Sequence, residues 1–223
     1  MEKPNVLNYS GTGSIFEAKI REILPSLYSY DIVQIIDRYN EPWRRYHNES
    51  HILKMLDIVD EIIPVSIFSP EERTLLQSMI IFHDVEFKLN REPGWNERES
   101  AAFARACLER AKATESYIRK IEVGVIATIT HTLDGVPEEL HEVVELLIDT
   151  DLRAGLGTNS TEFNYNTVNI GMEYDPLYTI VEYQTGRKKW AKGMLAREKI
   201  FLTDWFAHHE STARENLRLC ATD

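Results

Sequence analysis

Cysteine is scarce in this sequence. Only Cys107 and Cys220 occur among the 223 residues, and no CxxC pair is present. So few thiols exclude a disulfide framework and argue against a metal site built from thiolates. Two free thiols in a reducing compartment are the simplest interpretation.

Long apolar runs are also missing. No stretch reaches the roughly 18 apolar residues that a transmembrane helix needs. The opening segment, MEKPNVLNYSGTGS, lacks the apolar core of a secretory signal. We therefore expect a cytoplasmic protein that contacts no membrane.

Positive charge is in deficit. Lysine and arginine total 25 against 36 aspartate and glutamate residues, which gives a formal net charge of −11. Nucleic-acid binding is disfavoured because it depends on basic patches that contact phosphates. A small phosphorylated ligand remains compatible, since a metal ion or a few arginines can supply a local positive field.

Strand-like alternation, repeats and Pro/Gly/Ser linkers are absent, whereas a helical period of apolar residues fills most of the chain. Helix-start signals occur at Asn48, Ser69, Thr114 and Pro137. These patterns predict one all-α domain over residues 14–223, preceded by a flexible N-terminus over residues 1–13. The clearest helices are expected over 14–24, 26–39, 48–63, 70–86, 96–112, 115–133, 138–152 and, with a break, 187–219.

The segment RRYHNESH, residues 44–51, places His47 and His51 four residues apart. A zinc-protease helix has this spacing, but it also needs a glutamate directly after the first histidine to activate water. Here Asn48 takes that position. If Asn48 caps the helix, His47 lies before it and the two imidazoles do not share a face, so a zinc protease is disfavoured.

The segment IIFHDVEF, residues 80–87, is more informative. It ends an apolar run with His83 and Asp84, and a buried aspartate without a partner is costly. Adjacent helical residues diverge by about 100°, so this pair can share a metal only from a helix end. His51, His131 and Asp151 also lie beside apolar helical segments. Each has a structural explanation alone, but their number and order favour a site.

Nine segments, taken in chain order, resemble the HD-domain superfamily of metal-dependent phosphohydrolases, in particular a subgroup with an Arg-x-Tyr-His-Asn-x-x-His opening. The resemblance covers about residues 44–217. The segments are RRYHNESH, FHD, NERESA, TITH, DTDLRAGLG, GMEY, GRKKWAKGML, IFLTDWF and ESTARENL.

The resemblance implies an all-α HD fold and a divalent metal ion held by His51, His83, Asp84 and Asp151. Two imidazoles and two carboxylates suit Mn, Fe, Co, Ni or Zn, and Mg remains open. The resemblance also implies hydrolysis of a nucleotide or another small phosphate ester. One departure is Glu86, which would add a carboxylate near the metal.

A metal-bound water needs a proton acceptor. Glu97 in NERESA is the first candidate and Glu86 is the second. His47 and His131 are candidates for holding the phosphate or protonating the leaving group, and His131 could instead bind a second metal. Cationic side chains suited to a phosphate are Arg44, Arg45, Lys88, Arg153 and Arg187.

Two rival functions stay open. A di-iron oxygenase on the same fold would need further histidine ligands, for which His131 and His141 are the candidates. A non-catalytic module could keep the metal and bind a nucleotide without turnover. The substrate, the metal and the oligomeric state are not determined by the sequence.

Overall fold

The computed structural model describes residues 12–64, 68–89, 91–175 and 177–222. These residues are mainly helical and include no β-strand, which confirms the all-α prediction. The predicted flexible N-terminus falls mostly on residues 1–11, which lie outside the described residues, whereas Thr12 and Gly13 already belong to the first helix.

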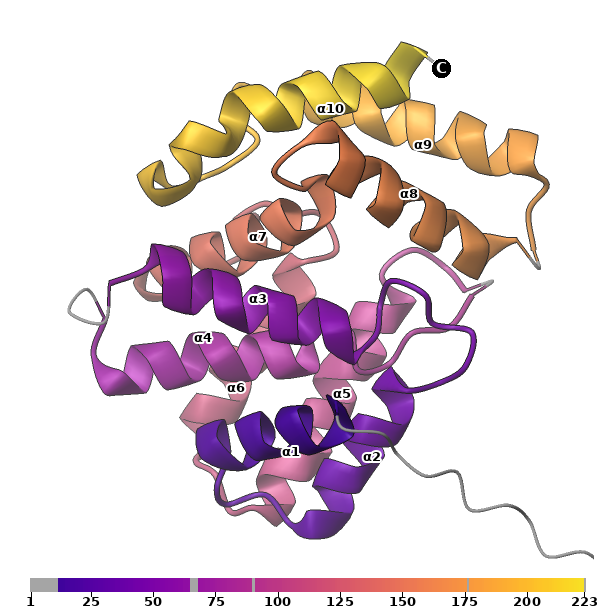
Figure 1. Ribbon diagram of the computed structural model, residues 1–223. Helices are drawn as coiled ribbons and strands as arrows, with labels where there is room; N and C mark the ends of the chain where they lie inside the picture. The colour runs from indigo at the N-terminus through magenta and orange to yellow at the C-terminus, as the bar shows by residue number, and fades with distance from the viewer. Residues whose placement is uncertain (1–11, 65–67, 90, 176, 223) are drawn as a thin grey trace, which may run out of the picture.

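The described residues form ten α-helices and two short 3₁₀ helices, η1 and η2 (Figure 1). In chain order they are α1 (Thr12–Ile23), α2 (Ser29–Tyr39), α3 (Glu49–Ile62), α4 (Pro70–Phe82), α5 (Trp95–Arg110), α6 (Glu115–Ala127), η1 (Glu138–Leu140), α7 (His141–Leu156), α8 (Ser160–Tyr174), α9 (Ile180–Leu195), η2 (Asp204–His209) and α10 (Glu210–Thr222).

Three predicted helix starts are capped by the expected side chains. Asn48, Ser69 and Thr114 each accept a hydrogen bond from a backbone N–H in the first turn of the helix that follows. Ser69 also forms a reciprocal capping box with Glu72. Pro137 precedes η1, from which α7 continues.

Helices α4 and α6 end well before their predicted ends at residues 86 and 133, and both early ends shape the site described below. Helix α4 stops at Phe82, and just beyond its end the guanidinium of Arg44 donates hydrogen bonds to the backbone carbonyls of Asp84 (2.8 Å) and Val85 (2.9 Å). Helix α6 stops at Ala127, and His131 in the following turn has a left-handed backbone with φ of 51°. The helix predicted over 187–219 is broken, as expected, into α9 and α10 with η2 between them, but α9 already begins at Ile180.

Helix α7 is central to the fold. Figure 1 shows it between α3 and α4 on one side and the α8–α10 layer on the other, and it packs against α3, α4, α8 and α10. Its buried residues surround the helix instead of forming one stripe, as expected for a core helix. A side chain on α7 can therefore meet residues from several distant segments.

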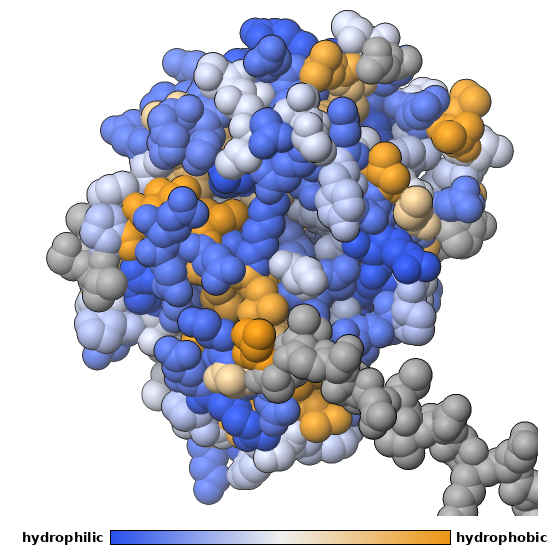
Figure 2. All heavy atoms as spheres, in the orientation of Figure 1, coloured by the Kyte–Doolittle hydropathy of each residue, from blue (hydrophilic) through white to orange (hydrophobic). Residues whose placement is uncertain are grey.

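The surface agrees with the acidic, polar composition. The face in Figure 2 is mainly hydrophilic, with hydrophobic residues gathered in separate patches. Among the described residues, no helix has the length and apolar character needed to cross a membrane.

Candidate metal centre and its pocket

Three segments that are far apart in the sequence bring four side chains to one point. His51 lies in the first turn of α3, His83 and Asp84 directly follow α4, and Asp151 lies on α7. Because α4 ends at Phe82, His83 and Asp84 leave the helix at its end. This is the geometry in which adjacent residues can face one ligand.

The ligand atoms of these residues lie close together. His51 Nε2 is 3.2 Å from Asp151 Oδ1 and 3.7 Å from Asp84 Oδ2. His83 Nε2 is 3.0 Å from Asp84 Oδ2 and 4.0 Å from Asp151 Oδ1. The candidate ligand atoms of His51, His83 and Asp84 all lie within 4.8 Å of one another. Two imidazoles and two carboxylates thus converge, as the resemblance implies.

The chemistry of the donors fits a cation. His51 Nε2 and His83 Nε2 are both buried and have no hydrogen-bond partner among the described residues. Unsatisfied buried polar atoms cost about 1–3 kcal/mol each, so two together call for a ligand. His83 Nδ1 lies 2.9 Å from the Ile80 carbonyl, an arrangement in which Nδ1–H donates and the Nε2 lone pair is available to a metal.

Both aspartates favour the ionised form that a metal requires. Burial alone would raise the pKa of Asp84, but the neighbouring imidazoles of His83, His47 and His51, with His83 the largest contributor among them, together hold this pKa well below its usual range. Burial likewise opposes ionisation of Asp151, yet the neighbouring His131, His51 and His83 imidazoles together lower its pKa. The carboxylates therefore present negative charge to the shared point.

A pocket of about 590 Å³ opens over the candidate metal centre. Asp84 and Asp151 form part of its lining, beside the polar side chains of His47, Glu97 and His131. The pocket is where a substrate could contact a metal ion and several titratable groups together, which is typical of an enzyme site.

His47 is oriented by a residue to which sequence analysis gave no role. The Glu173 carboxylate on α8 is 2.6 Å from His47 Nδ1, and it also accepts the backbone N–H groups of Tyr46 and His47. Burial lowers the pKa of His47, but the carboxylates of Glu173, Asp84 and Asp151, with Glu173 the largest contributor among them, together raise it overall. The GMEY segment contains Glu173, but no spacing links it to His47, which lies 126 residues earlier.

His131 contacts the centre from the turn after α6. Its Nε2 lies 3.0 Å from Asp151 Oδ2, while Arg197 donates a hydrogen bond to its backbone carbonyl. The imidazole is partly exposed and lines the pocket. It can hold Asp151 in place or contact a bound ligand.

Glu97 lies in the first turn of α5 and lines the pocket, as a water-orienting carboxylate would. Burial raises the pKa of Glu97, and the Asp84 carboxylate adds to the rise. A raised pKa makes the group a better proton acceptor. Among the described residues, Glu97, like Asp151, lies outside the compact group formed by His51, His83 and Asp84, and unlike Asp151 it forms no ion pair with either histidine.

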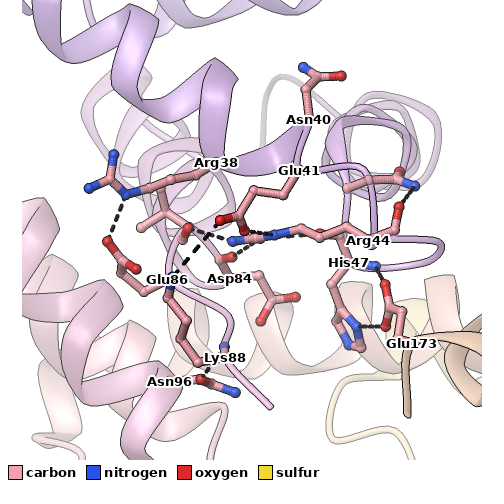
Figure 3. A network of polar contacts seen from close by, with 12 residues as sticks. Arg38, Asn40, Glu41, Arg44, His47, Asp84, Glu86, Lys88, Asn96 and Glu173 are labelled. Carbon is pink, nitrogen blue, oxygen red and sulfur yellow. Dashed lines mark hydrogen bonds and ion pairs between the residues drawn. The ribbon is translucent and has the colours of Figure 1, made fainter. Parts of the chain in front are cut away.

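Glu86, the second candidate base, faces another direction. Its carboxylate forms a 2.6 Å ion pair with Arg38 and does not line the pocket. Figure 3 shows this pair on one side of Arg44, with His47 and Glu173 on the other. Glu86 therefore does not add the carboxylate near the metal that its position after His83-Asp84 suggested.

Arg44 is buried and holds the protein's own backbone. Its guanidinium donates to the carbonyls of His47, Asp84 and Val85 and pairs with Glu41 (Figure 3). All of these contacts lie within the protein, and the side chain does not line the pocket. Arg44 thus positions the two segments that carry His47 and Asp84, in place of the expected role in phosphate binding.

Only one of the other four cationic candidates reaches the pocket. Arg187 lines it. Arg45 is exposed, Lys88 lies 3.9 Å from Glu41, and Arg153 donates to His209 Nε2, and none of these three lines the pocket. Sequence composition cannot separate these cases because each depends on tertiary neighbours.

Two further residues of the motif segments have structural contacts. Asp149 is buried on α7 and accepts hydrogen bonds from Leu202 and Thr203, so it anchors the segment before η2. His141 Nε2 lies 3.0 Å from the Val136 carbonyl, outside the pocket. The structure therefore does not bring His141 and His131 together as ligands for a second metal.

A scan against protein-family models found no match, and searches of curated proteins and of solved structures likewise found none.

Proposed function

We propose that this protein is a cytoplasmic, metal-dependent phosphohydrolase that acts on a nucleotide or another small phosphate ester. One observation carries the proposal: the two unpartnered, buried Nε2 atoms of His51 and His83 meet the carboxylates of Asp84 and Asp151 at the floor of a pocket. The order of motifs that resembles the HD-domain superfamily supports the same function.

A divalent ion held by His51, His83, Asp84 and Asp151 would supply Lewis acidity and an acidified water. Glu97 is the pocket carboxylate suited to accept the proton of the attacking water. His47, whose pKa is raised with the help of the Glu173 carboxylate, is suited to donate a proton to the leaving-group oxygen. Arg187 provides positive charge for the phosphate.

The test combines metal analysis with a phosphate-release screen. The purified protein is assayed for bound metals, then for phosphate release from nucleoside mono- and triphosphates and sugar phosphates. We expect one divalent ion per chain and release that a chelator abolishes. Full metal content without release from any compound would contradict a phosphohydrolase and favour a non-catalytic binding module.

The oxygenase alternative is separated by the same measurement, because it requires two irons per chain. Its second metal would need ligands beyond the four described. His141 was proposed for this purpose but contacts the Val136 carbonyl instead. The geometry of the described residues therefore favours the hydrolase.

A further inference from the structure

Aromatic side chains form the part of the pocket that α8 and α9 contribute. Tyr174, Tyr183 and Trp190 line it together with Phe87 from the segment after α4. The rings of Tyr174 and Tyr183 lie roughly parallel, with centroids 6.0 Å apart, and Tyr174 meets Phe87 edge to face at 6.5 Å. Phe87, Tyr174 and Tyr183 thus form one contacting group of rings, and Trp190 lines the same pocket.

Two hydrogen-bond donors of the pocket lining have no partner. The Tyr46 hydroxyl and Arg187 Nε are buried atoms that lack a hydrogen bond among the described residues. The Arg187 guanidinium lies over the Trp190 ring at 4.2 Å, so the cation borders the aromatic side chains. Two unpartnered donors and a metal centre in one pocket suit an anionic oxygen ligand.

The charge of the pocket lining limits how many phosphate groups the ligand can carry. Among the described residues that line the pocket, Arg187 is the only arginine or lysine, against the carboxylates of Asp84, Glu97, Asp151 and Glu182. A triphosphate would need several cations beyond one metal. A single phosphate group is therefore the better match.

We propose that the aromatic part of the pocket binds a planar ring carried by the substrate, so that the substrate is a phosphate monoester of an aromatic or heteroaromatic group. This inference rests on the proposed phosphohydrolase function and specifies its substrate class. A flat ring gains from contact with aromatic faces, as nucleobases do in single-strand-binding proteins. A saturated ring of similar size gains less because it lacks a π-face.

Two glycines on α9 allow the pocket to be narrowed with a matched control. Gly186 lines the pocket, whereas Gly193 lies on the same helix outside it. A Cβ atom added at either position would meet nothing within 4 Å. Gly186→Leu and Gly193→Leu should both fold, since each replaces a poor helix former with a good one. Only the first should fill the space beside the aromatic rings.

The probes are benzylphosphonate and cyclohexylmethylphosphonate, which differ in the planarity of the ring. Their C–P bond is not a phosphate ester, so calorimetric titration of the metal-loaded protein measures binding without turnover. We expect the parent protein and Gly193→Leu to bind benzylphosphonate about tenfold more tightly or better, the scale of one stacked ring. In Gly186→Leu this preference should fall to about threefold or less.

Equal affinity for the two probes, no binding of either, or an unchanged preference in Gly186→Leu would overturn the inference. The phosphate-release screen distinguishes this failure from failure of the proposed function. Release without preference for aromatic monoesters would keep the hydrolase and remove the aromatic site. Selective binding of benzylphosphonate by a protein that hydrolyses nothing would keep the aromatic site and remove the hydrolase.

A second pair of variants tests the anion contact. Arg187→Gln should weaken both phosphonates by a similar factor, because the guanidinium contacts the phosphonate and not the ring. Lys189→Gln, at an exposed position on the same helix, is the control and should bind both probes like the parent. A loss confined to benzylphosphonate in Arg187→Gln would contradict the assignment of Arg187 to the phosphate.

Discussion

The Glu173 carboxylate and His47 Nδ1 lie 2.6 Å apart, which joins the end of α8 to the loop before α3. Glu173 is almost fully buried, and it fixes both the backbone and the imidazole of His47. This contact leaves Nε2 as the ring nitrogen through which His47 can meet a ligand in the pocket. Glu173 thereby acts through His47 as a positioning residue.

Glu173→Gln should shift the alkaline limb of the activity profile to lower pH. Burial lowers the pKa of His47, but Glu173, with smaller contributions from Asp84 and Asp151, raises it overall, so the protonated form persists to higher pH than in an ordinary histidine. A neutral amide removes that support, and the pKa of His47 falls. We expect kcat to drop about tenfold to a hundredfold near neutral pH, with less loss in acid. The measurement is kcat against pH on a substrate found in the screen.

Asp175→Asn, two residues away and exposed, is the control and should keep the parental profile. Metal content should be unchanged in both variants, because neither residue belongs to the ligand group. A uniform fall in kcat across the pH range would show that Glu173 has only a structural role.

Arg44→Met should destabilise the fold and disturb the metal centre. The guanidinium is buried and satisfies three backbone carbonyls and one carboxylate, which methionine cannot replace. We expect the free energy of unfolding to fall by about 3–5 kcal/mol, as when one partner of a buried ionic network is removed. Urea denaturation of the variant and parent measures the change.

Arg45→Met is the matched control. Arg45 follows Arg44 in the sequence but is exposed, so its side chain should contribute less than about 0.5 kcal/mol to the free energy of unfolding. Equal stability of the two variants would contradict the structural role of Arg44. If Arg44→Met remained stable but lost affinity for a phosphonate, the sequence-based assignment to substrate binding would be restored.

Local sequence signals predicted where several helices begin. They did not predict which groups an individual charged side chain contacts. Ser69 and Thr114 cap their helices through hydrogen bonds to backbone groups three residues further along the chain. Sequence spacing is therefore enough to predict these caps. Arg44 and Arg187 carry the same group, yet one binds internal carbonyls and the other lines the pocket. That difference depends on where α4 ends and where α9 packs, which no local pattern specifies.

Residues of the candidate site were predictable where a motif resembled a known family. His51, His83, Asp84 and Asp151 were named together for that reason, and the structure brings them together. Glu173 was not given a role because its partner lies 126 residues away and a buried glutamate has no distinctive spacing.

Asp84→Asn should remove most of the bound metal. The amide has no negative charge and one fewer acceptor oxygen, which weakens a site formed by two imidazoles and two carboxylates. Glu86→Gln is the control two residues along the chain, because Glu86 pairs with Arg38 outside the pocket. Elemental analysis after purification should show near-parental metal in Glu86→Gln and little in Asp84→Asn. Full occupancy in Asp84→Asn would rule out the ligand set.

Glu97→Gln should separate metal binding from turnover. Glutamine keeps the size and hydrogen bonding of the side chain but cannot accept a proton, so metal content and fold should match the parent. We expect kcat to fall about a hundredfold, the usual scale for loss of a general base.

The pH dependence of kcat gives a second readout for Glu97→Gln. Since burial raises the pKa of Glu97, the acid limb of the parental kcat profile should lie at higher pH than an ordinary glutamate would give, and it should disappear in the variant. Glu99→Gln, exposed on the same helix, should retain parental kcat. Unchanged kcat in Glu97→Gln would leave proton transfer to another group, whereas loss of metal would make Glu97 a ligand.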